Sequence, residues 1–180
     1  IEAFRERQAH EAIKQALLDT SSASSQCVVA HGMGGTGKTV AAVAVMKHVA
    51  IREHYSRFAW VSIGQEALIE ELQETLMQQL TEKGMPQSEE AAEKQGRLKL
   101  LQDAAKTMKG RTLVVLDDPW LPQQVRFLNP LDPASESRLL VTTRIRGLVK
   151  RALEVPLELL NIEESAKMLL EIGQVDEAEY

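Results

Sequence analysis

The chain has 180 residues, of which 44% are hydrophobic and 26% are charged, a composition typical of a globular domain with its own core. Its net charge of -5 argues against a general nucleic-acid binder or a membrane-surface binder. The longest apolar stretch is too short to span a bilayer, and no basic segment precedes an apolar one at the N-terminus. We therefore expect a cytoplasmic protein that binds neither membrane nor nucleic acid.

The first two predicted elements are a helix and a buried strand. In "FRERQAHEAIKQALL", residues 4–18, apolar side chains recur at helical spacing, and a polar loop over residues 20–25 follows. The apolar run 27–31 begins with Cys27, the single cysteine of the chain. Because it has no partner for an internal disulfide, we expect it to act as a small buried hydrophobe, which fits a reducing compartment.

Five short apolar runs predict the strands of one sheet: 27–31, 58–63, 112–117, 138–143 and 152–157. Most are continuously apolar, which is typical of strands that are buried on both faces. Between them, helical patterns cover 38–51, 66–80 and 96–108, with Ser88 as the expected N-cap of the third. A last helix is expected from Ile162 to Ile172. Alternating strands and helices predict an α/β fold with a parallel sheet covered on both faces.

A glycine-rich loop follows the first strand. Four glycines lie within "GMGGTG", residues 32–37, and Lys38 and Thr39 come next, so the spacing is G-x-x-x-x-G-K-T between a strand and a helix. That pattern predicts a P-loop, in which backbone N–H groups and a helix N-terminus hold phosphate oxygens. Lys38 would reach the β- and γ-phosphates, and the Thr39 hydroxyl would bind Mg²⁺. The alternative is a glycine-rich turn that matches by chance, and its place between strand and helix argues against it.

Two further strands end in candidate site residues. "LVVLDD" ends in Asp117 and Asp118, of which Asp117 would hold Mg²⁺ and Asp118 would polarise an attacking water. "LLVTTR" ends in Arg144, which would contact the γ-phosphate. The alternatives are an ordinary Asp-Asp-Pro turn and a solvated arginine that opens the basic stretch "RIRGLVKR". An Arg144 strand between the P-loop strand and the Asp117 strand would indicate the ATPase branch, and the other order the kinase or GTPase branch.

Taken in order, the segments "GMGGTGKT", "FAWVSIGQ", "LVVLDDPW", "SRLLVTTR" and "VPLELLNIEESAKMLLEIG" resemble NB-ARC domains. These are nucleotide-binding switches of plant disease-resistance receptors and animal apoptosis adaptors, within the signal-transducing ATPases with numerous domains. The resemblance runs from about Cys27 to Gly173. It implies a P-loop NTPase with a five-stranded parallel sheet of order 5-1-4-3-2, in which residues 1–159 form the nucleotide-binding subdomain and 160–180 begin a truncated helical ARC subdomain.

The resemblance also implies site residues. Those assigned to nucleotide binding are Gly32, Met33, Gly34, Gly35, Thr36, Gly37, Lys38, Thr39 and Val40. Those assigned to catalysis are Lys38, Asp117, Asp118 and Arg144, and those assigned to the metal are Thr39 and Asp117. Trp60 matches a position that we interpret as packing.

The chain also departs from the family pattern. It lacks the G-L-P-L and M-H-D motifs that close over ADP, and Pro119 replaces the usual aliphatic residue. Upstream, "EAFRERQ" lacks the family's glycine, so adenine contacts by Phe4 or Arg5 are a conjecture. Because the chain starts at Ile1 and stops in "DEAEY", we expect it to be a piece of a longer protein whose signalling and sensing domains lie elsewhere.

Three functions are compatible with these residues. The favoured one is a regulatory switch that binds ADP or ATP with Mg²⁺ and hydrolyses ATP slowly. In the ATP state the full-length protein would form homo-oligomers, whereas we expect the fragment to be a monomer. The second is a turnover-driven AAA+-type or transcription-regulator ATPase. The third is an interaction scaffold with a vestigial pocket. No guanine-reading motif is present, and the preference for adenine rests mostly on the resemblance.

Overall fold

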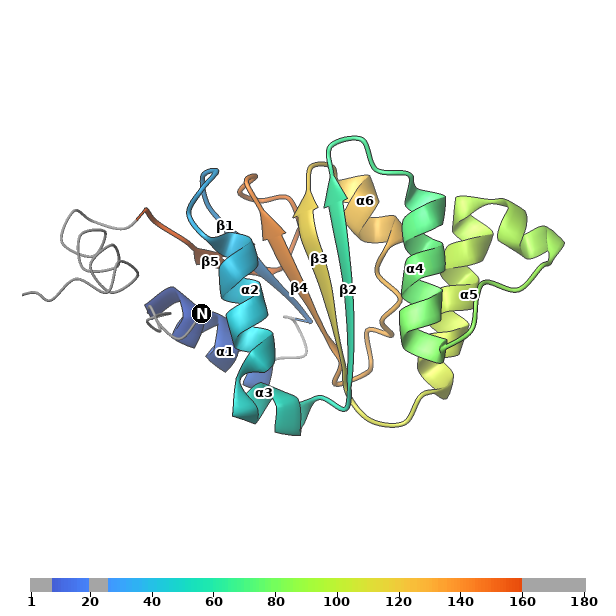
Figure 1. Cartoon of the computed structure of the whole chain (residues 1–180), viewed down its shortest axis with the longest axis horizontal. Coiled ribbons are helices and arrows are strands. Elements are labelled where there is room, and N and C mark those ends of the chain that lie inside the picture. The colour runs from blue at the N-terminus through green and yellow to red at the C-terminus, as the bar shows by residue number, and fades with distance from the viewer. Residues whose placement is uncertain (1–7, 20–25, 160–180) are drawn as a thin grey trace, which may run out of the picture.

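The computed structural model describes residues 8–19 and 26–159, and these residues fold around one five-stranded sheet (Figure 1). All five strands lie where apolar runs predicted them: β1 (Cys27–His31), β2 (Arg57–Gly64), β3 (Thr112–Pro119), β4 (Arg138–Thr143) and β5 (Leu153–Pro156). Every pairing between neighbours is parallel. The predicted helix over 162–172, the conjectured adenine contacts of Phe4 and Arg5, and the subdomain over 160–180 lie outside the described residues.

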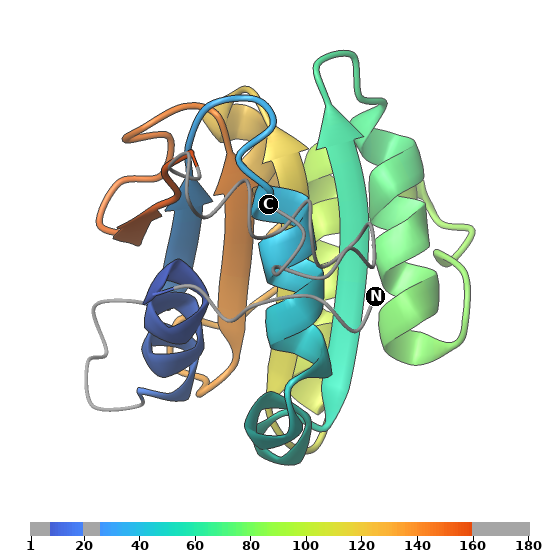
Figure 2. The same ribbon diagram turned by 60° about the vertical axis from the view of Figure 1, so that its left-hand side comes forward.

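The strand order is β2-β3-β4-β1-β5, which confirms the expected order 5-1-4-3-2 read from the other edge. The strand that precedes Arg144, β4, lies between the P-loop strand β1 and the Asp117 strand β3. This is the order of the ATPase branch. All five carboxyl ends point to the same end of the sheet, where the loop after β1 also lies (Figure 2).

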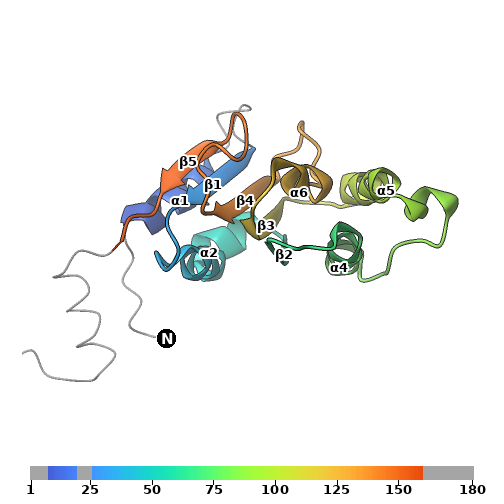
Figure 3. The same cartoon turned by 90° about the horizontal axis from the view of Figure 1, so that it is seen from above.

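Helices cover both faces of the sheet, and Figure 3 shows α2 and α6 on opposite sides of it. Their bounds are α1 (Gln8–Leu18), α2 (Lys38–Lys47), α3 (Val49–His54), α4 (Ile69–Thr81), α5 (Lys94–Thr107) and α6 (Pro122–Phe127), with a short 3₁₀ helix η1 (Glu89–Ala92). Alternate residues of β3 divide between two cores. Leu113 and Val115 pack in the core that includes α1, α2 and α3, and Val114 and Leu116 pack in the core that includes α4, α5 and α6. Burial on both faces explains why residues 113–116 of this strand are all apolar.

Two helix predictions were wrong in detail. The predicted helix 38–51 is broken at His48, whose extended backbone (φ -63°, ψ 135°) ends α2, while its ring accepts a hydrogen bond from the Ala50 N–H to begin α3. Ser88 caps η1 rather than α5, which begins at Lys94. The short helix α6 was not predicted, although Pro122 at its first position is a common start signal.

Trp60 and Cys27 both contribute to packing. Trp60 packs against the core under α1, α2 and α3, as we expected, and the Gln79 side chain hydrogen-bonds both its backbone N–H and its C=O (2.6 and 2.9 Å). Gln79 thus occupies the free edge of β2, which limits pairing with other chains. Cys27 is partly buried against the opposite core, and burial raises the pKa of its thiol to about 12.

None of the helices in the described part of the chain has the length and apolar character needed to cross a membrane.

Candidate functional site

The glycine-rich loop joins the carboxyl end of β1 to the first turn of α2. Gly35 and Gly37 both have φ of 84°, in the left-handed region that favours glycine, and a Cβ on either would meet no atom within 4 Å. The backbone conformation, not a lack of space, therefore requires glycine at these two positions. Gly37 is the N-cap of α2 and supplies no side-chain hydrogen bond, so the N-terminal N–H groups of the helix lack a side-chain cap.

Gly32 has a different role from the glycines that follow it. A Cβ on Gly32 would lie 2.3 Å from the carbonyl oxygen of Leu157, which directly follows β5. The Leu157 N–H donates to the His31 carbonyl at 2.7 Å, so the two backbones are held together at this point. Gly32 thus permits β1 and the end of β5 to approach closely, which is a packing requirement for glycine at this position.

Replacing Gly32 with alanine should lower the stability of the chain without nucleotide. Because the clashing atom belongs to the backbone, the strands must separate, and we expect a cost of about 2–3 kcal/mol and a fall in melting temperature of about 5–10 °C. Gly34→Ala is the matched control, since its Cβ would meet the Arg144 side chain at an ordinary 3.5 Å. Equal melting temperatures for the two variants in calorimetry would contradict this role for Gly32.

Lys38 begins α2, and its side chain reaches back to the glycine-rich loop. Its side chain is buried (8% exposed), and its ammonium donates hydrogen bonds to the carbonyls of Gly32 (2.9 Å) and Met33 (2.7 Å). Burial lowers the pKa of Lys38, and the positive charge of Arg144 lowers it further, against the opposing effects of Asp118 and Asp117. Two cations therefore lie near each other beside the loop, an arrangement that an anionic ligand would stabilise.

Asp117 is the buried carboxylate of the site. Its Oδ1 accepts hydrogen bonds from the hydroxyls of Thr39 (2.8 Å) and Thr142 (2.5 Å). The structure thus brings together the two residues predicted to hold the metal, one from α2 and one from β3. Thr142 was missed as a site residue, although the sequence shows polar threonines at the end of an apolar strand.

Asp118 has an unusual backbone conformation, and its side chain lies close to Arg144. Its φ is 55°, in the left-handed region that aspartate tolerates, and its N–H donates to the Thr142 hydroxyl at 3.1 Å. Its Oδ1 lies 3.4 Å from Arg144 Nε, and the Arg144 guanidinium lies over the Trp120 ring at 5.3 Å from the centroid. Trp120 is the second residue of the site that sequence reasoning missed.

The remaining predicted residues of the loop differ in the burial of their side chains. Met33 is 70% exposed and Val40 is 49% exposed, so neither side chain is buried in the site. Thr36 is buried, and its hydroxyl donates to the Met33 carbonyl at 3.0 Å, which bridges the loop. These three positions are consistent with a loop whose main chain binds the ligand.

The donor set fits Mg²⁺ only together with a nucleotide. No group of three or more His, Cys, Asp or Glu residues that could hold a metal occurs in residues 8–19 and 26–159. Thr39 and Asp117 offer one hydroxyl and one carboxylate from adjoining elements. Mg²⁺ commonly takes one or two carboxylates plus phosphate oxygens and water, and these two residues match that pattern.

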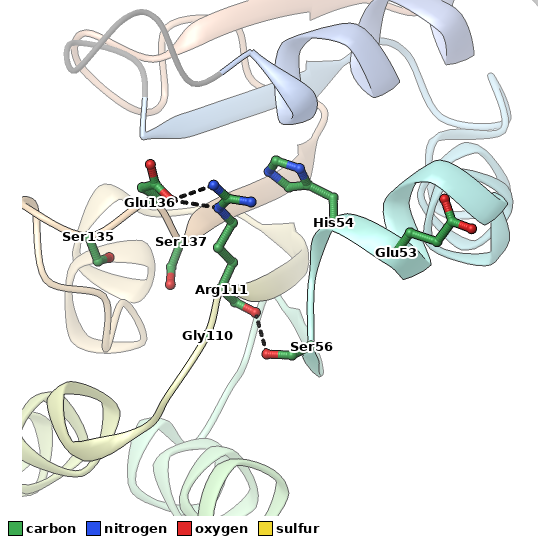
Figure 4. A pocket seen from close by; sticks show the side chains of 8 residues that line it. All are labelled: Glu53, His54, Ser56, Gly110, Arg111, Ser135, Glu136 and Ser137. Carbon is green, nitrogen blue, oxygen red and sulfur yellow. Dashed lines mark hydrogen bonds and ion pairs between the residues drawn. The ribbon is translucent and has the colours of Figure 1, made fainter.

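A separate cavity lies at the amino ends of β2, β3 and β4, away from the loop. It has a volume of about 450 Å³, and Figure 4 shows Arg111 paired with Glu136 across it (Arg111 Nη2 to Glu136 Oε2, 2.6 Å). His54 Nε2 is buried nearby without a hydrogen-bond partner, and burial and the charge of Arg111 lower the pKa of His54. None of the predicted site residues lines this cavity, so it is not the candidate nucleotide site.

The strand order and the glycine loop together define the class of the protein as a P-loop NTPase of the ATPase branch. Comparison with known families makes the assignment specific, because the family model described as the NB-ARC domain matches residues 6–179 of this chain. The chain belongs to the NB-ARC family.

Its relatives include plant resistance proteins. Disease resistance protein RPP8 of Arabidopsis thaliana is 32% identical over 150 residues, which are 79% of this chain and 16% of that protein. Probable disease resistance protein RXW24L of Arabidopsis thaliana is 30% identical over 128 residues, which are 70% of this chain and 14% of that protein. The chain therefore spans less than a fifth of the length of these relatives.

Solved structures show the same fold at low sequence identity. A signal transduction ATPase with numerous domains from Pyrococcus horikoshii, which carries a tetratricopeptide repeat sensor, matches with a TM-score of 0.64 and 20% identity over 99% of this chain and 27% of that one. The ORC1 protein of Aeropyrum pernix matches with a TM-score of 0.57 and 14% identity over 92% of this chain and 48% of that one. At such identities the likeness concerns the fold alone.

Proposed function

We propose that this chain is the nucleotide switch of an NLR-type disease-resistance protein, binding ADP or ATP with Mg²⁺ and hydrolysing ATP slowly. The observation that carries the proposal is that the cations of Lys38 and Arg144 both lie against a loop with left-handed glycines, next to the Thr39–Asp117 pair. Family membership and the plant resistance relatives support the biological assignment.

Each residue has a distinct task in this proposal. The loop backbone and Lys38 bind the phosphates, and Thr39 and Asp117 hold Mg²⁺, which when bound neutralises phosphate charge. Arg144 contacts the terminal phosphate and so distinguishes ATP from ADP. Asp118 orients the attacking water, but its carboxylate already pairs with Arg144 (3.4 Å), which supports slow hydrolysis.

Regulation requires a large difference in affinity between two states. A nearly complete change of population takes about 5.5 kcal/mol of differential nucleotide binding. Residues 1–159 form the nucleotide-binding part in this proposal, and residues 160–180 begin the helical subdomain that would respond to it. In this proposal the nucleotide-binding part contacts the signalling and sensing domains of the whole protein, and in the ATP state it also contacts further copies of that protein. The protein is cytoplasmic, and the fragment is a monomer.

Mass spectrometry of the nucleotide released from the purified chain, with a measurement of turnover, tests the proposal. We expect one ADP per chain and ATP turnover far below the enzyme median of about 10 per second. Turnover near that value would instead favour the motor-type ATPase. A chain that binds no adenine nucleotide in calorimetry would contradict both, and would favour an interaction scaffold.

A further inference from the structure

The guanidinium of Arg144 is bounded by three groups of the site. Arg144 Cζ lies over the Trp120 ring, 5.3 Å from the ring centroid. Asp118 Oδ1 lies 3.4 Å from Nε, and a Cβ built on Gly34 would lie 3.5 Å from Nη1. The Arg144 side chain is 50% exposed, and without such contacts an arginine of this exposure would occupy many rotamers.

These contacts leave the useful donors of Arg144 unoccupied. A cation–π contact involves the positive charge of the guanidinium and occupies none of its N–H donors. Arg144 pairs with the Asp118 carboxylate through Nε, and within residues 8–19 and 26–159 neither Nη1 nor Nη2 makes a hydrogen bond. The two terminal nitrogens therefore remain available to phosphate oxygens beside the glycine loop.

The backbone next to the Trp120 ring is held by two neighbouring side chains. The Thr143 hydroxyl donates to the carbonyl of Pro119 at 2.8 Å, and the Trp120 N–H donates to Gln124 Oε1 at 2.7 Å. Gln124 is buried and reaches across to the carbonyl of Gly64 at 3.2 Å. The ring thus lies on a segment that is hydrogen-bonded on both sides to β4 and α6, which favours a fixed position.

We propose that Trp120 is a positioning residue for Arg144, which it holds beside the phosphate loop with its terminal donors free. This rests on the proposed function, because it assumes that Arg144 contacts the terminal phosphate. By limiting the rotamers of Arg144 before binding, Trp120 reduces the entropy lost when ATP binds. ADP lacks the phosphate that Arg144 would contact, so Trp120 affects the ratio of ATP to ADP affinity rather than nucleotide affinity in general.

Calorimetry of Trp120 variants with ADP and a non-hydrolysable ATP analogue tests this. We expect Trp120→Leu to weaken binding of the ATP analogue about fivefold, the order of effect of immobilising one rotamer-rich side chain, and to leave ADP binding within about twofold. Trp120→Phe, which retains an aromatic face, should recover most of the loss. A loss shared equally by both nucleotides, or no recovery by phenylalanine, would overturn the inference.

Arg144→Ala shows whether Trp120 acts through Arg144. In that background, Trp120→Leu should cause no further loss of analogue affinity. If Arg144→Ala itself leaves analogue binding unchanged, the proposed role of Arg144 fails. If Arg144→Ala weakens it and Trp120→Leu does not, only the present inference fails.

Fluorescence gives a readout that does not depend on the folding of a Trp120 variant. Trp60→Phe leaves Trp120 as the single tryptophan of the chain. We expect its emission to shift with the ATP analogue and not with ADP, because the terminal phosphate neutralises the cation on the indole face. Identical responses to both nucleotides, or none to either at saturation, would overturn the inference.

Discussion

Replacing Lys38 with alanine should weaken the binding of both ADP and ATP by about 100-fold or more. The ammonium is buried at the centre of the loop and donates to the Gly32 and Met33 carbonyls, so it is already held where phosphates are expected. A hydrogen bond to a charged group contributes about 1.5–3 kcal/mol, and the alanine variant loses the hydrogen bonds and the positive charge that the ammonium would offer to the phosphates. Isothermal titration calorimetry with each nucleotide measures the loss.

Lys47→Ala is the matched control for this experiment. It makes the same change on the same helix, but at the other end of α2, about 14 Å along the axis at 1.5 Å per residue. We expect nucleotide affinity within about twofold of the parent. If Lys38→Ala binds ADP as tightly as Lys47→Ala does, the glycine-rich loop is not the phosphate site.

The strands were predictable because each carries a local signal. β1, β3 and β4 are buried on both faces, so each carries a continuous apolar run at its centre, and this is visible in the sequence. The order of the strands was not predictable from the residues themselves, because it depends on contacts between segments that are far apart in the chain. Only the resemblance to NB-ARC domains supplied it.

The same distinction applies to the site. The positions of Lys38 and Thr39 follow from a contiguous motif between a strand and a helix, which sequence reasoning can find. Thr142 and Trp120 become site residues only because β3 and β4 are adjacent, which places the Thr142 hydroxyl on Asp117 and the Trp120 ring on Arg144. Neither contact has a signature in local sequence.

Asp117→Asn should abolish most of the dependence of ATP binding on Mg²⁺. The asparagine keeps an oxygen that can accept from Thr39 and Thr142, so the buried hydrogen bonds, and with them the fold, are largely preserved. The negative charge is lost, however, and Mg²⁺ then has the Thr39 hydroxyl, the phosphates and water as ligands but no carboxylate. We expect the gain in ATP affinity on adding Mg²⁺ to fall from about tenfold or more in the parent, about 1.4 kcal/mol, to about twofold.

Asp118→Asn makes the same chemical change one residue further along the chain. Because Asp118 faces Arg144 rather than Thr39, we expect this variant to keep its Mg²⁺ dependence and to lose hydrolysis instead. Titrations with and without Mg²⁺, together with phosphate release, separate the two effects. If Asp118→Asn loses the response to Mg²⁺ and Asp117→Asn keeps it, the metal carboxylate is Asp118, and the hydrogen bond from Thr39 to Asp117 is structural only.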